Sequence, residues 1–394
     1  MTIAYLTDVE GRWDKIASFA DGNPHVRIDG TALRLAEGVT FVFGGDSIDR
    51  GPHGRRILAT LTGARRDYGD RVVLLAGNRD LNKLRLARDL VVPPPGAPPG
   101  ASRAELLRWI LTATMGAPQA FAHRAAELAT AGAPAGDDAV VDSFLDDVRP
   151  GGAVLAYLHA ARLAYRAGPT LFVHGGVSRE NLLASPGGGI SRDVDGWIAA
   201  LDRFYAAELA TFAAGGVPEA LIAYQAPRPG THLNQASVVY ARPTDDDGNP
   251  HLPEPDVIAQ LRAGGIERVV VGHTPSGDCP AILHDDGFEL VLGDNSYGRI
   301  EHGSQLAFTD AETTVRGATE LDDGTRLPVA YRHARGDRSA RIGRRDHDTG
   351  QLVKAPLAGD RYLLFRGLPA RKVEQLAAPA TDVDRRRLGP AGAP

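Results

Sequence analysis

The stretch VTFVFGGDSIDRG, residues 39–51, decides the fold of this chain. Five apolar or β-branched residues run into two glycines, and an aspartate follows at once. A short apolar run of this kind is typical of a buried strand, and a Gly/Asp loop after it is typical of the ligand-binding end of a strand in an α/β sheet. The stretch therefore predicts a central strand with polar side chains at its carboxyl end.

Four other segments have the same character, with a polar residue directly after an apolar run. They are Asp8-Val9-Glu10-Gly11, Gly77-Asn78-Arg79-Asp80, His174-Gly175-Gly176 and Gly272-His273-Thr274. Carboxylates, an amide and two imidazoles thus arrive in order at the ends of successive strands. Such ligands suit a pair of hard or borderline metal ions, and paired metals in an open site promote phosphoryl transfer to water.

Residues 1–80 have the pattern of alternating strands and helices that predicts an α/β core. We expect strands at 3–7, 39–43 and 72–76, and helices at 12–20 and 53–66. Residues 81–168 are different: after a helix at 82–90 and a Pro/Gly loop at 91–101, an Ala/Leu-rich pattern predicts three or four helices up to 167. This insert is either a cap beside the site or a packing appendage.

The second half returns to strands. We expect helices at 192–214, 217–224 and 255–263, and strands at 236–241, 268–271, 281–284, 289–292 and 305–309. Residues 1–327 are thus expected to form the main domain, with 328–394 as an Arg-rich extension that is weakly periodic apart from 361–365. We expect disorder at 377–394, and the arginines are either a solvated face or a partner-binding surface.

Composition bounds the partners and the compartment. The 394 residues carry a net charge of −5, which argues against binding of nucleic acid or an anionic membrane. The one cysteine, Cys279, allows no disulfide within the chain and no thiolate metal cage. With no leader pattern and no apolar stretch of membrane-spanning length, we expect a cytoplasmic protein.

The ordered motifs resemble the calcineurin-like metallophosphoesterase superfamily, and within it the phosphoprotein phosphatase branch, which includes bacterial serine/threonine phosphatases and symmetrical dinucleoside tetraphosphatases. Residues 45–51 match that branch's Gly-Asp-x-x-Asp-Arg-Gly, and Gly272-His273-Thr274-Pro275 and Tyr240-Ala241-Arg242-Pro243 resemble later motifs. The resemblance covers about 1–80, 169–176 and 236–295. It implies an α/β, four-layer sandwich of two mixed β-sheets flanked by helices, with a helical insert at about 81–168.

The resemblance also implies roles for single residues. Asp46 would bridge two metal ions, Asp8 and Glu10 would bind the first ion, and Asn78, His174 and His273 would bind the second. Arg50 and Arg242 would hold phosphoryl oxygens, Asp49 would orient a neighbouring group, and Tyr297 is either a substrate contact or part of a turn. The catalytic candidates are Asp49, Arg50 and Arg79.

Two positions depart from the family pattern, and Glu10 is the first. The family has Asp-x-His where this chain has Asp8-Val9-Glu10. A carboxylate in place of an imidazole favours harder ions, so we expect Mn²⁺, with Mg²⁺ or ferric iron as alternatives to it, rather than Zn²⁺. The other interpretation is that Glu10 faces solvent and the first metal position is weak or empty.

Arg79 is the second departure, because the family has Gly-Asn-His-Glu/Asp. That imidazole assists the leaving group as a general acid, and arginine cannot give up a proton near neutral pH. We expect Asp49 to pair with Arg79. A leaving group that is already a stable anion suffers little from the loss of an acid, so the substitution favours a phosphoanhydride substrate.

The leading hypothesis is therefore a dinuclear metal-dependent phosphohydrolase, in which a hydroxide held between the metals attacks phosphorus in line. Its expected substrate is a small phosphorylated molecule such as a nucleotide or dinucleoside polyphosphate. The alternatives are a protein serine/threonine phosphatase, a metalloenzyme repurposed for a specialised metabolite, and a binding module that has lost turnover.

Overall fold

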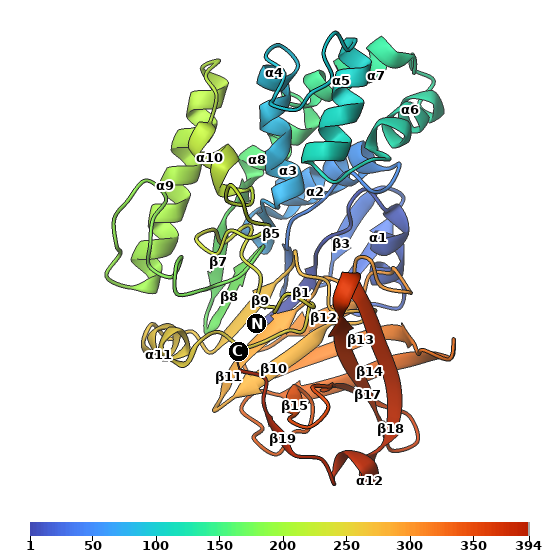
Figure 1. Ribbon diagram of the computed structural model, residues 1–394, viewed down its shortest axis with the longest axis vertical. Helices are drawn as coiled ribbons and strands as arrows, with labels where there is room; N and C mark the ends of the chain where they lie inside the picture. The colour runs from blue at the N-terminus through green and yellow to red at the C-terminus, as the bar shows by residue number, and fades with distance from the viewer. Residues whose placement is uncertain (393–394) are drawn as a thin grey trace.

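Two mixed β-sheets pack face to face in the computed structural model, which describes residues 1–392 (Figure 1). Successive side chains of the first strand point to opposite faces of its sheet. Tyr5 points to the second sheet, where its ring lies 5.7 Å from that of Phe172, whereas Ala4 and Leu6 pack toward the helices. This period of two places one core between the sheets and another beneath the helices.

The larger sheet has the order β14-β13-β12-β1-β4-β5-β6. Strands β1, β4, β5 and β6 are parallel, and β12, β13 and β14 continue the sheet in antiparallel fashion. Their bounds are β1 (Thr2–Leu6), β4 (Val39–Phe43), β5 (Val72–Leu75), β6 (Ala161–Arg162), β12 (Gln305–Phe308), β13 (Glu312–Glu320) and β14 (Arg326–Ala334).

The smaller sheet has the order β10-β11-β9-β8-β7, and only β8, β9 and β11 run parallel. Its strands are β7 (Ala164–Ala167), β8 (Thr170–Val173), β9 (Arg268–Val271), β10 (Ala281–Asp285) and β11 (Phe288–Leu292). A separate hairpin joins β2 (Val26–Asp29) to β3 (Ala32–Leu35).

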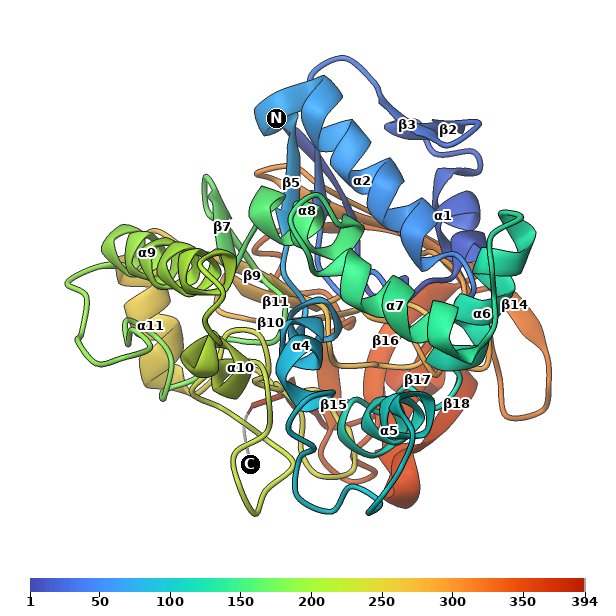
Figure 2. The ribbon, with the colours of Figure 1, turned by 90° about the horizontal axis from the view of Figure 1, so that it is seen from above.

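Helices cover the outer faces of both sheets (Figure 2). On one side lie α1 (Trp13–Ala20) and α2 (Gly54–Tyr68), and on the other lie α9 (Val194–Ala213) and α11 (Pro255–Ala263), with α10 (Glu219–Tyr224) beside α9. The predicted fold class, α/β with two mixed sheets flanked by helices, is thus confirmed. No helix among residues 1–392 is long and apolar enough to cross a membrane.

The predicted helical insert stands above the sheets in Figure 1. It has a hydrophobic core of its own, which includes Leu107, Val140 and Phe144. The expected helix at 82–90 is divided into a 3-10 turn and α4, and the helical prediction is wrong for β6 and β7, which form strands before residue 168. The helices are α3 (Asn78–Leu81), α4 (Leu86–Asp89), α5 (Arg103–Trp109), α6 (Ala120–Thr130), α7 (Asp137–Asp147) and α8 (Ala153–Ala160), with a π-helical stretch at Ile110–Thr114.

The strand predicted at 236–241 is a pair of turns instead. The hydroxyl of Ser237 accepts hydrogen bonds from the backbone N–H groups of Val239 and Tyr240, at 3.1 and 3.2 Å, and so closes a turn that competes with the strand. Val238 and Val239 are buried, which explains why the segment has the composition of a strand.

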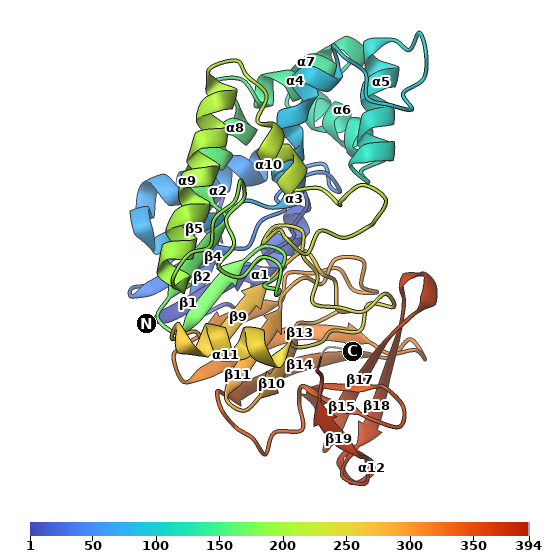
Figure 3. The same cartoon turned by 60° about the vertical axis from the view of Figure 1, so that its left-hand side comes forward.

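The C-terminal region forms a third, antiparallel sheet in the order β18-β17-β16-β15-β19 (Figure 3). The expectation of disorder is wrong for 377–392, and residues 393 and 394 lie outside the described chain. The expected boundary at 327/328 falls inside β14, which pairs along its length with β13. The elements are β15 (Arg344–Asp346), β16 (Leu352–Leu357), β17 (Arg361–Leu368), β18 (Lys372–Pro379), α12 (Ala380–Val383) and β19 (Leu388–Pro390).

Candidate metal centre

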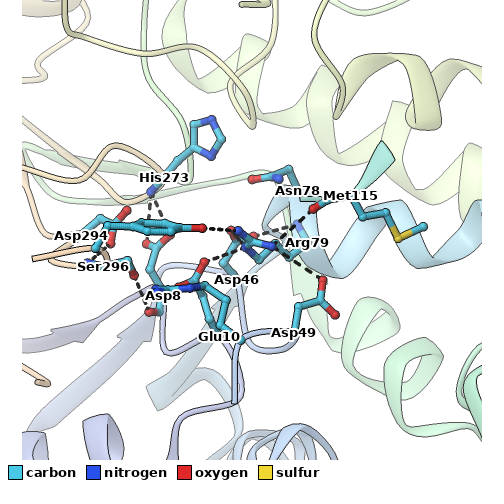
Figure 4. Close-up of polar contacts among 12 residues, drawn as sticks. Asp8, Glu10, Asp46, Asp49, Asn78, Arg79, Met115, His273, Asp294 and Ser296 are labelled. Atoms are coloured by element: carbon cyan, nitrogen blue, oxygen red, sulfur yellow. Dashed lines mark hydrogen bonds and ion pairs between the residues drawn. The ribbon is translucent and has the colours of Figure 1, made fainter. Parts of the chain in front are cut away.

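Side chains from the ends of three strands lie close together, and Figure 4 shows two of them, Asp46 and His273. Asp46 follows β4, His174 follows β8 and His273 follows β9, and one ligand atom of each lies within 4.8 Å of the others. The amide of Asn78, the first residue of α3, joins them, with its Oδ1 3.3 Å from Nε2 of His174. The structure therefore brings together four of the predicted metal ligands.

This group fits a divalent cation. Nδ1 of His174 lies 2.7 Å from the carbonyl oxygen of Gly44, which can only accept, so Nδ1 carries the proton and Nε2 faces Asp46. Nε2 of His273 is buried and has no hydrogen-bond partner among residues 1–392. A carboxylate, an amide oxygen and two imidazoles, one of which has a buried nitrogen without a partner, form the donor set of a metal site.

The charges of the group are strongly perturbed. Burial lowers the pKa of His174, but the adjacent Asp46 carboxylate more than offsets this and raises it to about 10. Burial alone would raise the pKa of Asp46, yet His174 and Arg79 hold it below its ordinary value. The pKa of His273 lies well below the ordinary value because of burial and the nearby positive charge of Arg242. The arrangement therefore favours an anionic Asp46 and a neutral His273.

The backbone at the site is strained. Ten non-glycine residues of the described chain have a positive φ, and six of them lie here: Asp8, Glu10, Asp46, Asp49, His273 and Tyr297. Such conformations cost free energy and persist at functional sites, where the surrounding structure enforces them. Gly77 and Gly272 leave the necessary room. A Cβ at Gly77 would lie 2.2 Å from Asp46 Oδ1, and a Cβ at Gly272 would lie 2.4 Å from Asp8 Oδ2.

Asp80 connects two of the loops. Its carboxylate accepts hydrogen bonds from the backbone N–H groups of Gly77, Asp46 and Ser47, at 2.9 to 3.0 Å, and from the Ser47 hydroxyl. Asp80 therefore caps the start of α3 and holds the backbone of the loop that carries Asp46.

Asp8 lies beside the group, and its carboxylate accepts hydrogen bonds from neighbouring residues. Its carboxylate accepts a hydrogen bond from the Thr7 hydroxyl at 2.5 Å and lies 3.1 Å from the backbone nitrogen of His273. Burial and the nearby Asp294 raise its pKa well above the ordinary value. Lys15, which sequence analysis missed, donates to the carbonyl oxygen of Asp8 at 2.7 Å and to Ser296 at 2.8 Å.

Glu10 is placed neither as a metal ligand nor as a solvent-facing side chain. It is buried, and its two oxygens are taken by two arginines: Oε1 lies 2.6 Å from Nε of Arg79, and Oε2 lies 2.8 Å from Nη1 of Arg50. The metal-ligand expectation for Glu10 needs this correction, because a carboxylate already bound by two guanidinium groups is their counterion.

The expected Asp49–Arg79 pair is only a distant one. Nη1 of Arg79 is 3.9 Å from Asp49 Oδ2, whereas Nζ of Lys83 is 2.6 Å from the same oxygen. Lys83 is fully buried and was missed. The helix predicted at 82–90 begins after Arg79, so no sequence signal places the two cations together.

The substrate-binding candidates lie around the same cations. Arg50 stacks 3.8 Å from the centre of the Tyr297 ring, and its Nη2 is 2.8 Å from Oε1 of Glu301, a residue that sequence analysis missed. The hydroxyl of Tyr297 accepts a hydrogen bond from Nη2 of Arg79 at 2.9 Å, while the residue remains 58% exposed. Arg242 is half-buried on the His273 side.

The insert reaches this site through Met115. Its carbonyl oxygen lies 3.5 Å from Nη1 of Arg79 and its sulfur lies 3.8 Å from Nζ of Lys83 (Figure 4). The insert therefore contacts the side chain of Arg79 through Met115.

Comparisons with known proteins give likenesses of structure alone. No protein-family model and no curated protein matches the sequence. A cold-active protein-tyrosine phosphatase of a psychrophilic Shewanella species is 17% identical with a TM-score of 0.48, over 83% of this chain and 80% of that one. A protein serine/threonine phosphatase from Saccharomyces cerevisiae is 11% identical with a TM-score of 0.41, over 79% and 73%.

A metallophosphoesterase from Sphaerobacter thermophilus is 11% identical, with a TM-score of 0.33 over 85% of this chain and 87% of that one. Identities and scores at this level assign no activity, so a function has to be argued from the site itself. In the order of its sequence motifs, the chain resembles the calcineurin-like metallophosphoesterases.

Proposed function

We propose that this protein is a metal-dependent phosphohydrolase. The observation that carries the proposal is the convergence of Asp46, Asn78, His174 and His273 on one point, with a buried imidazole nitrogen that lacks a partner. Strained backbone at Asp46 and His273 supports the same conclusion, because strain is retained where function requires the geometry.

The four ligands would hold a divalent ion, for which Mn²⁺ is our first choice. Such an ion supplies Lewis acidity at a phosphoryl oxygen and lowers the pKa of bound water. The chain's own residues would orient the substrate: Arg50 lies against Tyr297 and Arg242 lies near His273, and a guanidinium matches the geometry of phosphoryl oxygens. Tyr297, exposed and stacked on Arg50, would line the entrance.

Arg79 argues for a substrate class. No histidine stands at its position, and its guanidinium keeps its proton, so it cannot protonate a departing alkoxide. It can stabilise the negative charge of a departing phosphate. We therefore propose a small phosphoanhydride, such as a nucleoside polyphosphate, in preference to an alkyl phosphomonoester or a phosphoserine peptide.

The test is phosphate release by the full chain, depleted of metal and reloaded with Mn²⁺, from nucleotides, dinucleoside polyphosphates, phosphopeptides, alkyl phosphates and p-nitrophenyl phosphate. We expect turnover of anhydrides to exceed that of alkyl esters. Equal rates on both would refute the substrate class. No release from any compound, with His273→Ala as the matched inactive control, would refute the phosphohydrolase and favour a binding module.

A further inference from the structure

The guanidinium of Arg79 lies among three carboxylates from two loops. Its Nε is 2.6 Å from Glu10 Oε1 and 3.5 Å from Asp46 Oδ2, and its Nη1 is 3.9 Å from Asp49 Oδ2. The side chain is only 10% exposed. Buried carboxylates need a cation beside them, and here the chain provides that cation itself.

Asp46 has two different neighbours. Its Oδ1 lies 3.3 Å from Nε2 of His174, within the metal centre, while its Oδ2 faces the side chain of Arg79. In the family that this chain resembles, the same carboxylate bridges two ions. Here a guanidinium stands on one side of it, and the ligand group stands on the other.

We infer that Arg79 takes the place of the first metal ion and that the chain binds a single ion, held by Asp46, Asn78, His174 and His273. This inference rests on the proposed function, because the site of that ion is part of the same proposal. A second ion on the Oδ2 side would lie next to a fixed positive charge, and it would find Glu10 already bound on both oxygens. Repulsion and the loss of Glu10 as a ligand both oppose it.

The guanidinium is fixed in place from several directions. Nη2 donates to the Tyr297 hydroxyl at 2.9 Å, and Nη1 lies 3.5 Å from the carbonyl oxygen of Met115 in the insert. Lys83 neutralises Asp49 at 2.6 Å, so that carboxylate is not free to bind an ion either. Because arginine remains protonated at all ordinary pH values, this charge does not dissociate as a metal ion does.

The experiment counts Mn²⁺ in the full-length protein after depletion with a chelator, reloading and dialysis, by elemental analysis. Electron paramagnetic resonance of the same sample separates isolated Mn²⁺ from an exchange-coupled pair. We expect one ion per chain and the spectrum of isolated Mn²⁺. Two ions per chain, a coupled spectrum, or no bound ion would overturn the inference.

Two matched variants test whether Arg79 is what excludes the second ion. The double variant Glu10→His, Arg79→His restores the family's motifs, and we expect it to bind two ions and to show the coupled spectrum. Glu10→His alone keeps the guanidinium, and we expect it to bind one ion. A double variant that retains the circular dichroism of the wild type but binds only one ion would contradict the inference. If that variant does not fold, the count and spectrum of the wild type decide.

Activity separates this inference from the function on which it rests. Two ions with hydrolysis of phosphoanhydrides would overturn the role of Arg79 and leave the phosphohydrolase standing. One ion with no hydrolysis of any phosphate compound would support the role of Arg79 and refute the phosphohydrolase.

Discussion

The carboxylate of Asp80 accepts a hydrogen bond from the backbone N–H of Ser47 at 2.9 Å and another from its hydroxyl at 2.5 Å, so one loop of the centre holds the backbone of another. We expect Asp80→Ala to lower the free energy of unfolding by about 3–5 kcal/mol, because several buried N–H groups lose their acceptor. Denaturant unfolding of the metal-free protein measures this. Asp67→Ala, at a partly exposed ion pair, should change it by less than about 0.5 kcal/mol, and equal effects would contradict the prediction.

Metal affinity should depend on His273. We expect His273→Ala to weaken Mn²⁺ binding by more than about 100-fold, since even residues that only support a ligand cost about 10- to 100-fold. Titration calorimetry measures the change. The control is His232→Ala, whose side chain is 75% exposed, and its affinity should equal that of the wild type. Chelation should abolish phosphate release, and added Mn²⁺ should restore it.

The hydroxyl of Tyr297 should matter because it fixes Arg79. Tyr297→Phe keeps the ring over Arg50 and removes one hydrogen bond, so we expect kcat/KM for an anhydride to fall about fivefold, which corresponds to about 1 kcal/mol. Tyr297→Ala should cost more. The matched control is Tyr362→Phe. The hydroxyl of Tyr362 also accepts a hydrogen bond from an arginine, Arg341, at 3.0 Å, but it lies in the C-terminal sheet. That variant should keep full activity, and a similar loss in both would refute the assignment.

A buried ion pair makes stability depend on pH. Burial raises the pKa of Glu289, but His333 and Arg268, whose Nε is 2.8 Å away, more than offset this and lower it below 4.5. A carboxyl whose pKa is lower in the folded state contributes stability above its unfolded pKa and loses it as the pH falls through the folded value. The loss should therefore begin near pH 4.5 and continue below it.

Glu289→Gln tests this contribution, and we expect it to lower the free energy of unfolding at pH 7 by about 3–5 kcal/mol and to flatten the acid limb of the stability curve. Asp70→Asn removes a fully exposed partner of Arg65 and should cost less than about 1 kcal/mol. An acid limb as steep in Glu289→Gln as in the wild type would contradict the assignment.

The C-terminal sheet should influence metal binding from a distance. Nε2 of Gln375 in β18 donates to the Asp278 carboxylate at 2.7 Å, and Lys354 in β16 donates to the carbonyl oxygen of Ser276. Both acceptors lie in the segment after His273. We expect Gln375→Ala to weaken Mn²⁺ binding about tenfold, because supporting residues fix the orientation of a ligand.

The matched control for that change is Gln351→Ala. Gln351 lies in the same region, and its Nε2 donates to Glu374 at 2.7 Å, away from the His273 segment. It should lower the melting temperature without changing the affinity for Mn²⁺. If both variants bind Mn²⁺ as the wild type does, the sheet does not act on the centre.

The parallel strands of the core could be predicted from the sequence because a strand buried on both faces is an uninterrupted apolar run. The predicted strand at 39–43 agrees with β4 at both ends. The third sheet could not be predicted in this way. Its strand β16 contains Lys354, which is fully buried over the ring of Phe365. Strand β14, at the edge of the first sheet, was missed as well, because its exposed positions include Arg326 and Arg332 beside small residues.

The members of the site could be predicted better than their partners. Loops after strands identify Asp46, His174 and His273, because the carboxyl ends of parallel strands lie at one edge. No local rule assigns Glu10 to Arg79 rather than to an ion, since that choice depends on the length and direction of both side chains in three dimensions. Lys83 and Glu301 were missed for the same reason.

The position of β14 bears on which part of the chain can be studied alone. Its residues run across 327/328, and the sheet that follows lies against the segment after His273. A fragment that stops at residue 327 would keep every ligand of the centre and still lose the surface on which one ligand loop rests. The candidate metal ligands and the C-terminal sheet should therefore be expressed and redesigned as one piece.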